Sequence, residues 1–279
     1  MEQSFLLGGD LLINRMGFGA MRITGKGIWG APGDQAQAIE VLRSLPELGV
    51  DFIDTADSYG PNVSEELIAE ALHPYRNGLV IATKGGFMRT GPNEWHVKSD
   101  PDHLKRALEG SLKRLKVEMI DLYQLHRIDP NVPFEVSLKF LREARDQGLI
   151  RHIGLSEVSV DEIKKAQEYV DVATVQNKYS IVFRKWEPEL EYCAQNNIGF
   201  IPWNPINAGN ILFVELLKEL AEKYGATMQQ VALSWLYHHA PNIILIPGTS
   251  KVAHLRENVA SVNVKLSAED MKRMANFSV

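Results

Sequence analysis

Short apolar runs alternate with longer helical patterns along almost the whole chain, and this alternation restricts the fold more than any other sequence feature. Eight runs, many of them rich in β-branched residues, predict strands at 16–20, 52–56, 79–83, 120–125, 150–155, 172–176, 199–203 and 243–246. The segments between them have the apolar spacing of amphipathic helices. Such alternation in 279 residues predicts an α/β protein, a (β/α)8 TIM barrel whose one domain spans residues 1–279.

The chain begins with a different pattern, which predicts a β-hairpin rather than a β/α unit. The apolar stretches 5–7 and 11–13 flank Gly8-Gly9-Asp10, which is a turn sequence. We expect this hairpin to cap one end of the barrel. A doubly wound sheet is the alternative architecture, but it usually has a glycine-rich turn after its first strand, and GxGxxG does not occur in this sequence.

Composition argues against several classes of function. The net charge of −5 and the pI of about 5.9 leave no basic excess to bind the phosphates of a nucleic acid. Apolar runs such as 79–82 and 243–246 are far too short to span a bilayer, and the first residues lack the pattern of a signal peptide. Cys193 is the one cysteine, so no internal disulfide can form. We therefore expect a cytoplasmic protein with no nucleic-acid or membrane partner.

Polar residues stand at the ends of the predicted strands, where the active site of such a barrel lies. Asp54 and Tyr59 follow the second strand, Lys84 ends the third and His126 ends the fourth. A free tyrosine titrates at about 10, so a nearby ammonium is expected to lower its pKa, while a carboxylate keeps that ammonium charged. A histidine can orient a substrate oxygen. This set of side chains suits protonation of the oxygen when a carbonyl is reduced.

With their flanking residues and spacing, Asp54, Tyr59, Lys84 and His126 resemble the catalytic tetrad of the aldo-keto reductase superfamily. The similarity covers nearly the whole chain, because Gly-Phe-Gly at 17–19, Gly-Leu-Ser at 154–156, Gln-Asn at 176–177 and Ile-Pro-Gly-Thr-Ser at 246–250 follow in the family's order. Some motifs are similar to those of members that reduce pyridoxal. The resemblance implies an NADP(H)-dependent oxidoreductase that reduces an aldehyde or ketone to an alcohol, with Tyr59 as the proton donor.

The same resemblance implies that NADP(H) lies extended across the mouth of the barrel. Ser156 and Gln176 would bind the nicotinamide carboxamide, and Trp203 would stack on the nicotinamide ring. The remaining residues implied in cofactor binding are Gly19, Ala20, Met21 and Asp54, then Asn204, Pro205, Ile206 and Gly209 along the pyrophosphate, Gly248, Thr249, Ser250, Lys251 and His254 at the 2′-phosphate, and Asn258 at the adenine.

Two positions depart from the family pattern. Glu157 stands where many relatives have Asn; a carboxylate can accept a hydrogen bond from the carboxamide nitrogen but cannot donate one. His254 stands where many relatives have Arg, and imidazole is mostly neutral at pH 7. The 2′-phosphate would then depend on Lys251 and on backbone N–H groups.

Two other functions compete with carbonyl reduction. A non-catalytic subunit that senses NADP(H) can have the same fold and the same tetrad. A barrel isomerase or lyase is less consistent with the pyrophosphate segment, and no Cys/His cluster has the spacing of a metal site, so we expect no metal. We expect a small carbonyl compound as substrate, with pyridoxal as a candidate, and favour a monomer. His96 and His103 are interpreted as structural, while Trp29, Phe87 and Trp95 are either loop residues or walls of an apolar substrate pocket.

Overall fold

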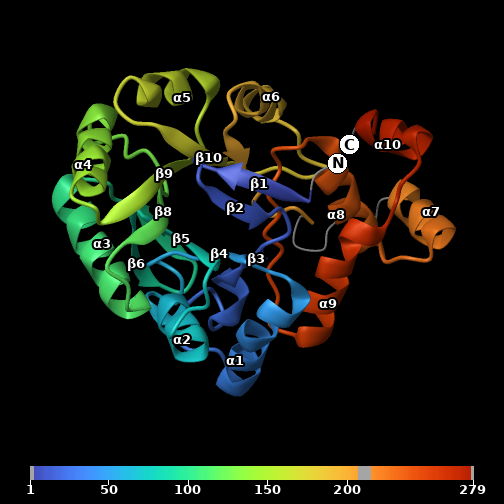
Figure 1. Cartoon of the computed structure of the whole chain (residues 1–279), viewed down its shortest axis with the longest axis horizontal. Helices are drawn as coiled ribbons and strands as arrows, with labels where there is room; N and C mark the ends of the chain where they lie inside the picture. The colour runs from blue at the N-terminus through green and yellow to red at the C-terminus, as the bar shows by residue number, and fades with distance from the viewer. Residues whose placement is uncertain (1–2, 207–214, 278–279) are drawn as a thin grey trace.

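Seven parallel strands form the central sheet of the computed structural model, which describes residues 3–206 and 215–277. In spatial order they are β11 (Gly199–Phe200), β10 (Val172–Gln176), β9 (Ile150–Ser156), β8 (Ile120–Leu125), β5 (Val80–Gly85), β4 (Phe52–Asp54) and β3 (Phe18–Gly19). Neighbours in the sheet are successive parallel strands of the chain, as in a barrel of β/α units. Figure 1 shows them in the middle of a ring of helices.

The segment 243–246 closes the sheet into a barrel, although single bridges rather than a regular ladder pair it with its neighbours. Ile243 pairs in parallel with Phe200 of β11, and Leu245 pairs with Met16, just before β3. The Ile244 N–H donates to the Phe200 carbonyl at 2.9 Å, and the Gly17 N–H donates to the Leu245 carbonyl at 2.8 Å. These contacts on both sides complete the barrel, and the predicted (β/α)8 fold is confirmed.

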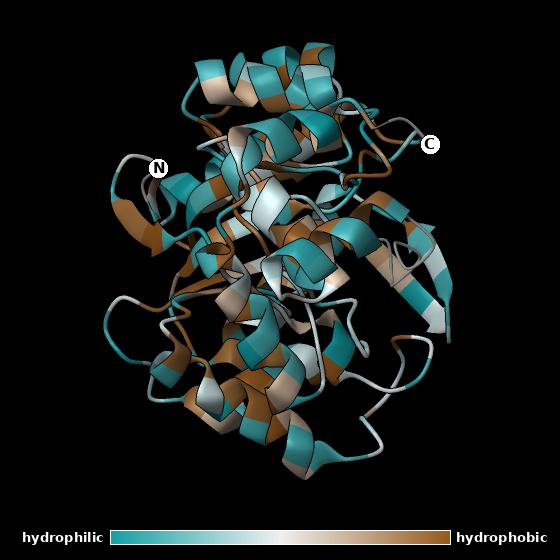
Figure 2. Cartoon of the chain, turned by 90° about the vertical axis from the view of Figure 1, so that its right-hand side faces the viewer, coloured by the Kyte–Doolittle hydropathy of each residue, from teal (hydrophilic) through white to brown (hydrophobic). Residues whose placement is uncertain are grey.

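Amphipathic helices surround the strands and turn apolar residues toward them. Figure 2 shows hydrophilic and hydrophobic residues alternating along these helices. The helices of the described ranges are α1 (Gln35–Ser44), α2 (Val63–Leu72), α3 (Pro101–Leu115), α4 (Phe134–Asp146), α5 (Val160–Gln167), α6 (Glu187–Gln195), α7 (Glu215–Tyr224), α8 (Met228–His239), α9 (Val252–Ala260) and α10 (Ala268–Ala275), with short 3₁₀ turns at Ala20–Ile23, Pro46–Leu48 and Ser261–Asn263. Among these described residues no helix is long and apolar enough to cross a membrane.

The start of α3 illustrates how the sequence fixes these helices. The Asp100 side chain caps the helix by accepting from the His103 N–H at 3.0 Å, and Pro101 follows at the first helical position. Leu104, Leu108 and Leu115 are buried, whereas the residues between them are mostly polar. The spacing of these leucines places one apolar face of α3 against the barrel.

The predicted N-terminal hairpin is present and closes one end of the barrel. Its strands are β1 (Ser4–Leu7) and β2 (Leu11–Asn14), and Figure 1 shows them lying across the middle of the ring of helices. Leu7 and Ile13 are buried in one apolar cluster with the barrel residues Phe52, Leu122 and Ile201. The cluster also contains Val80, Ala82, Ala173, Ile244 and Ile246. The hairpin therefore closes, with apolar side chains, the end of the barrel opposite the carboxyl ends of the strands.

A second hairpin, which the sequence analysis did not predict, follows β5. Its strands β6 (Phe87–Gly91) and β7 (Glu94–Val97) pair antiparallel around the Pro92-Asn93 turn. Arg89 fastens this hairpin to two loops, because its guanidinium donates to the carbonyls of Ile28 at 2.9 Å and Ser58 at 2.8 Å. The hairpin thus becomes a wall of the barrel mouth.

Candidate active site

The four predicted catalytic residues come together at the carboxyl ends of three neighbouring strands. Asp54 is the last residue of β4, Lys84 lies in β5, and His126 directly follows β8. Tyr59 stands on the turn after β4, which is held to β5 because the Asp57 N–H donates to the Lys84 carbonyl at 3.2 Å. We call Asp54, Tyr59, Lys84 and His126 the tetrad cluster; all four are buried.

Lys84 uses its whole ammonium group inside this cluster. Its Nζ donates to Asp54 Oδ1 at 2.6 Å, to the Thr55 carbonyl at 2.8 Å and to the Tyr59 hydroxyl at 3.4 Å. Burial alone would lower the pKa of Lys84, but the charge of Asp54 and the Tyr59 hydroxyl outweigh it, so the pKa lies above its ordinary value. Lys84 is therefore a fixed positive charge beside the tyrosine.

Asp54 is fully used as an acceptor. Its Oδ1 binds Lys84, while its Oδ2 accepts from Gln124 Nε2 and from Gln176 Nε2, both at 2.9 Å. A buried carboxylate is tolerated when it is paired and hydrogen-bonded in this way. Asp54 therefore holds the ammonium of Lys84 and orients the amide of Gln176 at once.

The pKa of Tyr59 differs from the sequence-based expectation. Burial raises its pKa above the ordinary value of tyrosine, and the positive charge of Lys84 opposes that rise without reversing it. The sequence analysis considered only the effect of the ammonium on the pKa. It did not include the energetic cost of ionising a phenol that is buried away from water. Tyr59 thus stays protonated at neutral pH and keeps a proton to donate.

His126 is a neutral imidazole in this environment. Burial lowers its pKa well below the ordinary value, and the charges of Lys84 and Arg127 lower it further. Its ring lies 6.0 Å from that of Tyr59 and 4.5 Å from that of Phe87, measured between centroids. Its Nδ1 is buried without a partner in the described part of the chain. A neutral histidine here can hydrogen-bond a carbonyl oxygen without repelling a cation.

A cavity of about 510 Å³ opens above the tetrad cluster. Tyr59 and His126 stand among apolar and aromatic walls supplied by Ile28, Phe87 and Trp95. Phe87 and Trp95 are thus walls of the pocket, one of the two alternatives left open by the sequence, whereas Trp29 is stacked against Arg89 at 5.6 Å and does not line this cavity. The remaining lining residues are Gly19, Met21, Arg22, Asp54, Arg127, Ser156, Gln176, Trp203, Asn204, Pro205, Ile206, Ile246, Pro247 and Gly248.

Glu157 fixes Trp203 instead of facing the cavity as a free carboxylate. Glu157 has a left-handed backbone with φ of 56°, and its Oε1 accepts from the Trp203 indole Nε1 at 2.7 Å and from the Lys178 N–H at 2.6 Å. These contacts set the position of the indole at the edge of the cavity. The carboxylate at this position therefore serves as an acceptor for the Trp203 indole and for the Lys178 backbone N–H.

A second, more polar cavity of about 490 Å³ adjoins the first. The two share Met21, Arg22, Ile28 and Gly248, and the second adds Lys26, Thr24, Gly25, Gly27, Asn93, Thr249 and Ser250. The position of Arg22 just after the first barrel strand predicts that it faces the mouth, and it lines both cavities. Lys26 is a second cation in the lining, and the sequence analysis did not assign it to the site.

The other described residues expected at the cofactor are not among those that line the two cavities. Lys251 and His254 are exposed at the start of α9, and Asn258 is buried in the same helix. Ala20 is buried beneath the mouth in the turn that follows β3. Gly209 lies outside the described residues. The site thus joins an aromatic chamber to a polar, cationic one.

The histidines interpreted as structural lie away from the tetrad cluster. His96 is on the outer hairpin, where its Nε2 and Thr90 Oγ1 are 2.9 Å apart, and His103 is on α3. In the two described ranges no group of three or more His, Cys, Asp or Glu side chains could hold a metal ion.

Comparisons with known proteins agree with the fold. The sequence profile of the Aldo/keto reductase family matches residues 15–278. An uncharacterized oxidoreductase of Schizosaccharomyces pombe is 52% identical over 94% of this chain and 85% of its own length, and the pyridoxine 4-dehydrogenase of Escherichia coli K12 is 39% identical over 97% and 96%. A thermostable aldo-keto reductase solved with the inhibitor epalrestat superimposes with a TM-score of 0.85 at 32% identity, covering 98% of each chain.

Proposed function

The chain belongs to the aldo/keto reductase family, and from this premise we propose that it reduces an aldehyde to an alcohol with NADPH. The observation that carries the proposal is the buried Tyr59 hydroxyl, 3.4 Å from the ammonium of Lys84 and at the floor of an aromatic cavity. When bound, NADPH supplies a hydride to the carbonyl carbon. The protein must then neutralise the charge that develops on the oxygen.

The tetrad cluster supplies the proton for that oxygen. Tyr59 donates it, and Lys84 stabilises the phenolate that is left, because its ammonium is held beside the hydroxyl by Asp54. His126, neutral and facing Tyr59, hydrogen-bonds the carbonyl oxygen and orients it. The aromatic walls around the cavity keep water away from these groups.

The residues present fit a dinucleotide. Ser156, Gln176 and Trp203 line the aromatic chamber, where a nicotinamide would lie, and Arg22, Lys26 and Ser250 line the polar one, which suits phosphates. Gly248 lines both chambers and packs closely against another backbone segment: a Cβ on Gly248 would lie 2.5 Å from the Gly19 carbonyl. Only glycine allows this close approach at the boundary between the two chambers.

An aromatic aldehyde is the substrate class that the walls favour. Phe87 and Trp95 are 5.3 Å apart between ring centroids at 70°, and Trp95 is 6.4 Å from Tyr59, so a flat ring finds edge and face partners above the tetrad cluster. The relative named pyridoxine 4-dehydrogenase supports pyridoxal, a ring-bearing aldehyde, as a candidate.

A non-catalytic subunit that senses NADP(H) is the competing function. Turnover, and its dependence on Tyr59, distinguishes the two functions. We expect steady NADPH oxidation with simple aromatic aldehydes, and a loss of turnover of roughly 10²–10⁴-fold in Tyr59→Phe with nearly unchanged NADPH binding. Absorbance at the NADPH band measures turnover, and fluorescence titration measures binding. Binding without oxidation of NADPH by the wild type would favour the sensor, and full turnover in Tyr59→Phe would exclude Tyr59 as the donor.

A further inference from the structure

A single arginine beside the tetrad cluster has no anionic partner. Arg127 follows His126, is half-buried, and lines the cavity that also contains Tyr59. Its Nη1 donates to the His126 carbonyl at 2.6 Å and to Ser156 Oγ at 2.8 Å. No carboxylate of the described chain lies within ion-pair distance of Arg127. A partly desolvated charge normally has a counter-charge, and none is supplied here by the protein.

The remaining donors of this guanidinium form one open edge. Within the described residues Nε and Nη2 make no hydrogen bond, and neither is among the buried atoms that lack a partner, so both remain accessible on a residue that lines the cavity. Phe87 lies 5.4 Å and Trp203 6.0 Å from Cζ, measured to the ring centroids. These aromatic neighbours restrict the guanidinium, and its free edge has the two-pronged geometry that matches an oxygen anion.

Glu157 attracts the guanidinium of Arg127 from beyond ion-pair distance, and its Oε1 accepts from Trp203 Nε1 at 2.7 Å and from the Lys178 N–H at 2.6 Å. Glu157 therefore balances the charge of Arg127 only at a distance and occupies none of its donors.

The proposed cofactor is a poor partner for this edge. A carboxamide is neutral, and the nicotinamide ring becomes positively charged when it is oxidised, so Arg127 would repel the product form of the cofactor. An anion on the substrate would offset both charges. We propose that Arg127 determines substrate specificity by binding an anionic oxygen group, a carboxylate or a phenolate, carried by the aromatic aldehyde. This inference rests on the proposed function and adds a charge requirement to it.

Two matched pairs of aldehydes test the proposal. 4-Carboxybenzaldehyde is compared with its neutral methyl ester, and 2-hydroxybenzaldehyde, at a pH where its phenol is ionised, with 2-methoxybenzaldehyde. For each enzyme, kcat/KM for the anionic aldehyde is divided by kcat/KM for its neutral partner. The first pair tests recognition of a carboxylate and the second pair tests recognition of a phenolate, so the two pairs together show which anion is bound.

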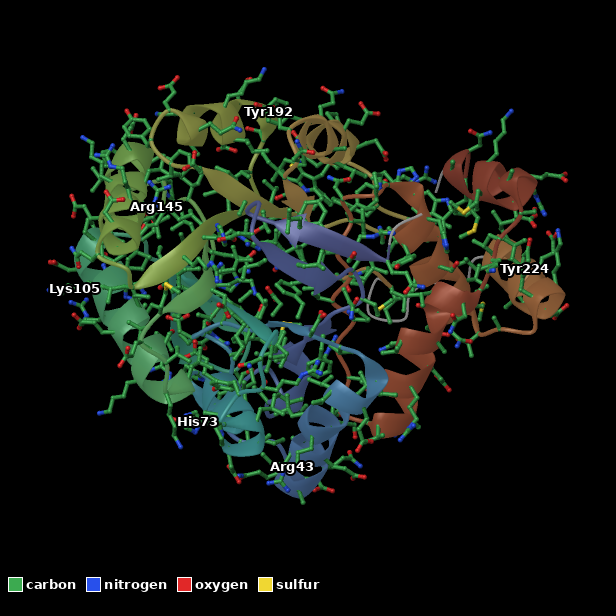
Figure 3. All side chains as sticks on the ribbon, in the orientation of Figure 1. Arg43, His73, Lys105, Arg145, Tyr192 and Tyr224 are labelled. Atoms are coloured by element: carbon green, nitrogen blue, oxygen red, sulfur yellow. The ribbon has the colours of Figure 1, made fainter. Side chains whose placement is uncertain are left out.

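We expect the wild type to prefer the anionic member of at least one pair. Arg127→Met should lower that ratio by roughly tenfold to a hundredfold, the value of a charge-assisted contact. Arg127→Lys should keep part of the preference. The Kd of NADPH, measured by fluorescence, should change by no more than about threefold, which is under 1 kcal/mol. Arg43→Met, on the outer side of α1 in Figure 3, controls for the loss of one positive charge.

Three results would count against these proposals in different ways. Equal ratios in wild type and Arg127→Met, or no preference for either anion in the wild type, would overturn the specificity role. A Kd of NADPH that rises as far as kcat/KM falls would assign Arg127 to the cofactor instead. No oxidation of NADPH with any of the four aldehydes would overturn the proposed reductase function itself.

Discussion

The tetrad cluster and the segment 248–258, whose first three residues line the second cavity, are held in different ways. Asp54 and Lys84 are buried and bonded to each other, to Tyr59 and to two glutamines. Lys251 and His254, in contrast, are exposed at the start of α9, and the backbone N–H of Lys251 donates to Thr249 Oγ1 at 3.1 Å. The first region is held by hydrogen bonds and an ion pair among its own side chains, whereas the exposed ammonium of Lys251 makes no ion pair within the described ranges.

This difference predicts different consequences of mutation. Changes in the tetrad cluster should affect turnover and stability together, because its side chains support one another. Changes to the exposed side chains of the segment 248–258 should affect ligand affinity alone. The following experiments are ordered by the size of the expected effect.

Lys84→Met should have the largest effect, with turnover reduced by roughly 10²–10⁴-fold. It also leaves the buried carboxylate of Asp54 without its charge partner, which should lower the free energy of unfolding by about 3–5 kcal/mol. The double variant Asp54→Asn/Lys84→Met removes both charges, so it should regain stability without regaining turnover. Urea unfolding and steady-state rates measure the two properties. If the double variant were as unstable as the single one, the pairing in the cluster would not explain its rigidity.

Lys251→Ala should weaken NADPH binding by roughly tenfold to a hundredfold and leave NADH binding nearly unchanged. The reason is that only NADPH carries the 2′-phosphate, and Lys251 is the full positive charge at the start of α9. Lys105→Ala, on the outer face of α3 in Figure 3, is the matched control. Equal losses of affinity for both cofactors would mean that Lys251 supports the loop. A changed unfolding midpoint in Lys251→Ala would contradict the difference between this segment and the tetrad cluster.

Asp57, next to the tetrad cluster, should make stability depend on pH. Burial and the nearby Glu65 raise its pKa to about 8, and its Oδ1 has no partner in the described ranges. A carboxyl whose folded-state pKa is raised stabilises the fold when protonated, and this contribution is lost as pH rises toward 8. Relative to Asp57→Asn, the wild type should lose about 1.4 kcal/mol of unfolding free energy per pH unit between about pH 5 and 7. Urea unfolding of both proteins at each pH measures this, and a constant difference would refute it.

The sequence was sufficient for the barrel and for the position of the tetrad cluster. Strand-end placement follows from the alternating pattern, so Asp54, Lys84 and His126 could be brought together without coordinates. The hairpin at 87–97 was missed because its strands are short and its alternation resembles a polar loop. The eighth strand was located correctly, but single bridges replace the expected ladder.

What the sequence could not provide depends on burial and on distant partners. The direction of the Tyr59 pKa shift required its depth in the protein. The pairing of Glu157 with Trp203 joins residues 46 positions apart, and no local pattern reports it. The sequence places Arg127 directly after His126. That no carboxylate of the described residues forms an ion pair with Arg127 can be recognised only when the positions of the neighbouring carboxylates are known.

The N-terminal hairpin has a consequence for how such a chain can evolve or be engineered. Leu7 and Ile13 close the end of the barrel opposite the mouth. Replacing either with Ala should therefore lower the free energy of unfolding by about 2–5 kcal/mol without changing the residues of the active site. Leu6 and Leu12, on the outer face, are 51% and 64% exposed and are free to become polar. Substitutions in the hairpin that raise the free energy of unfolding can therefore compensate for destabilising substitutions at the mouth of the barrel, where changes in substrate specificity arise.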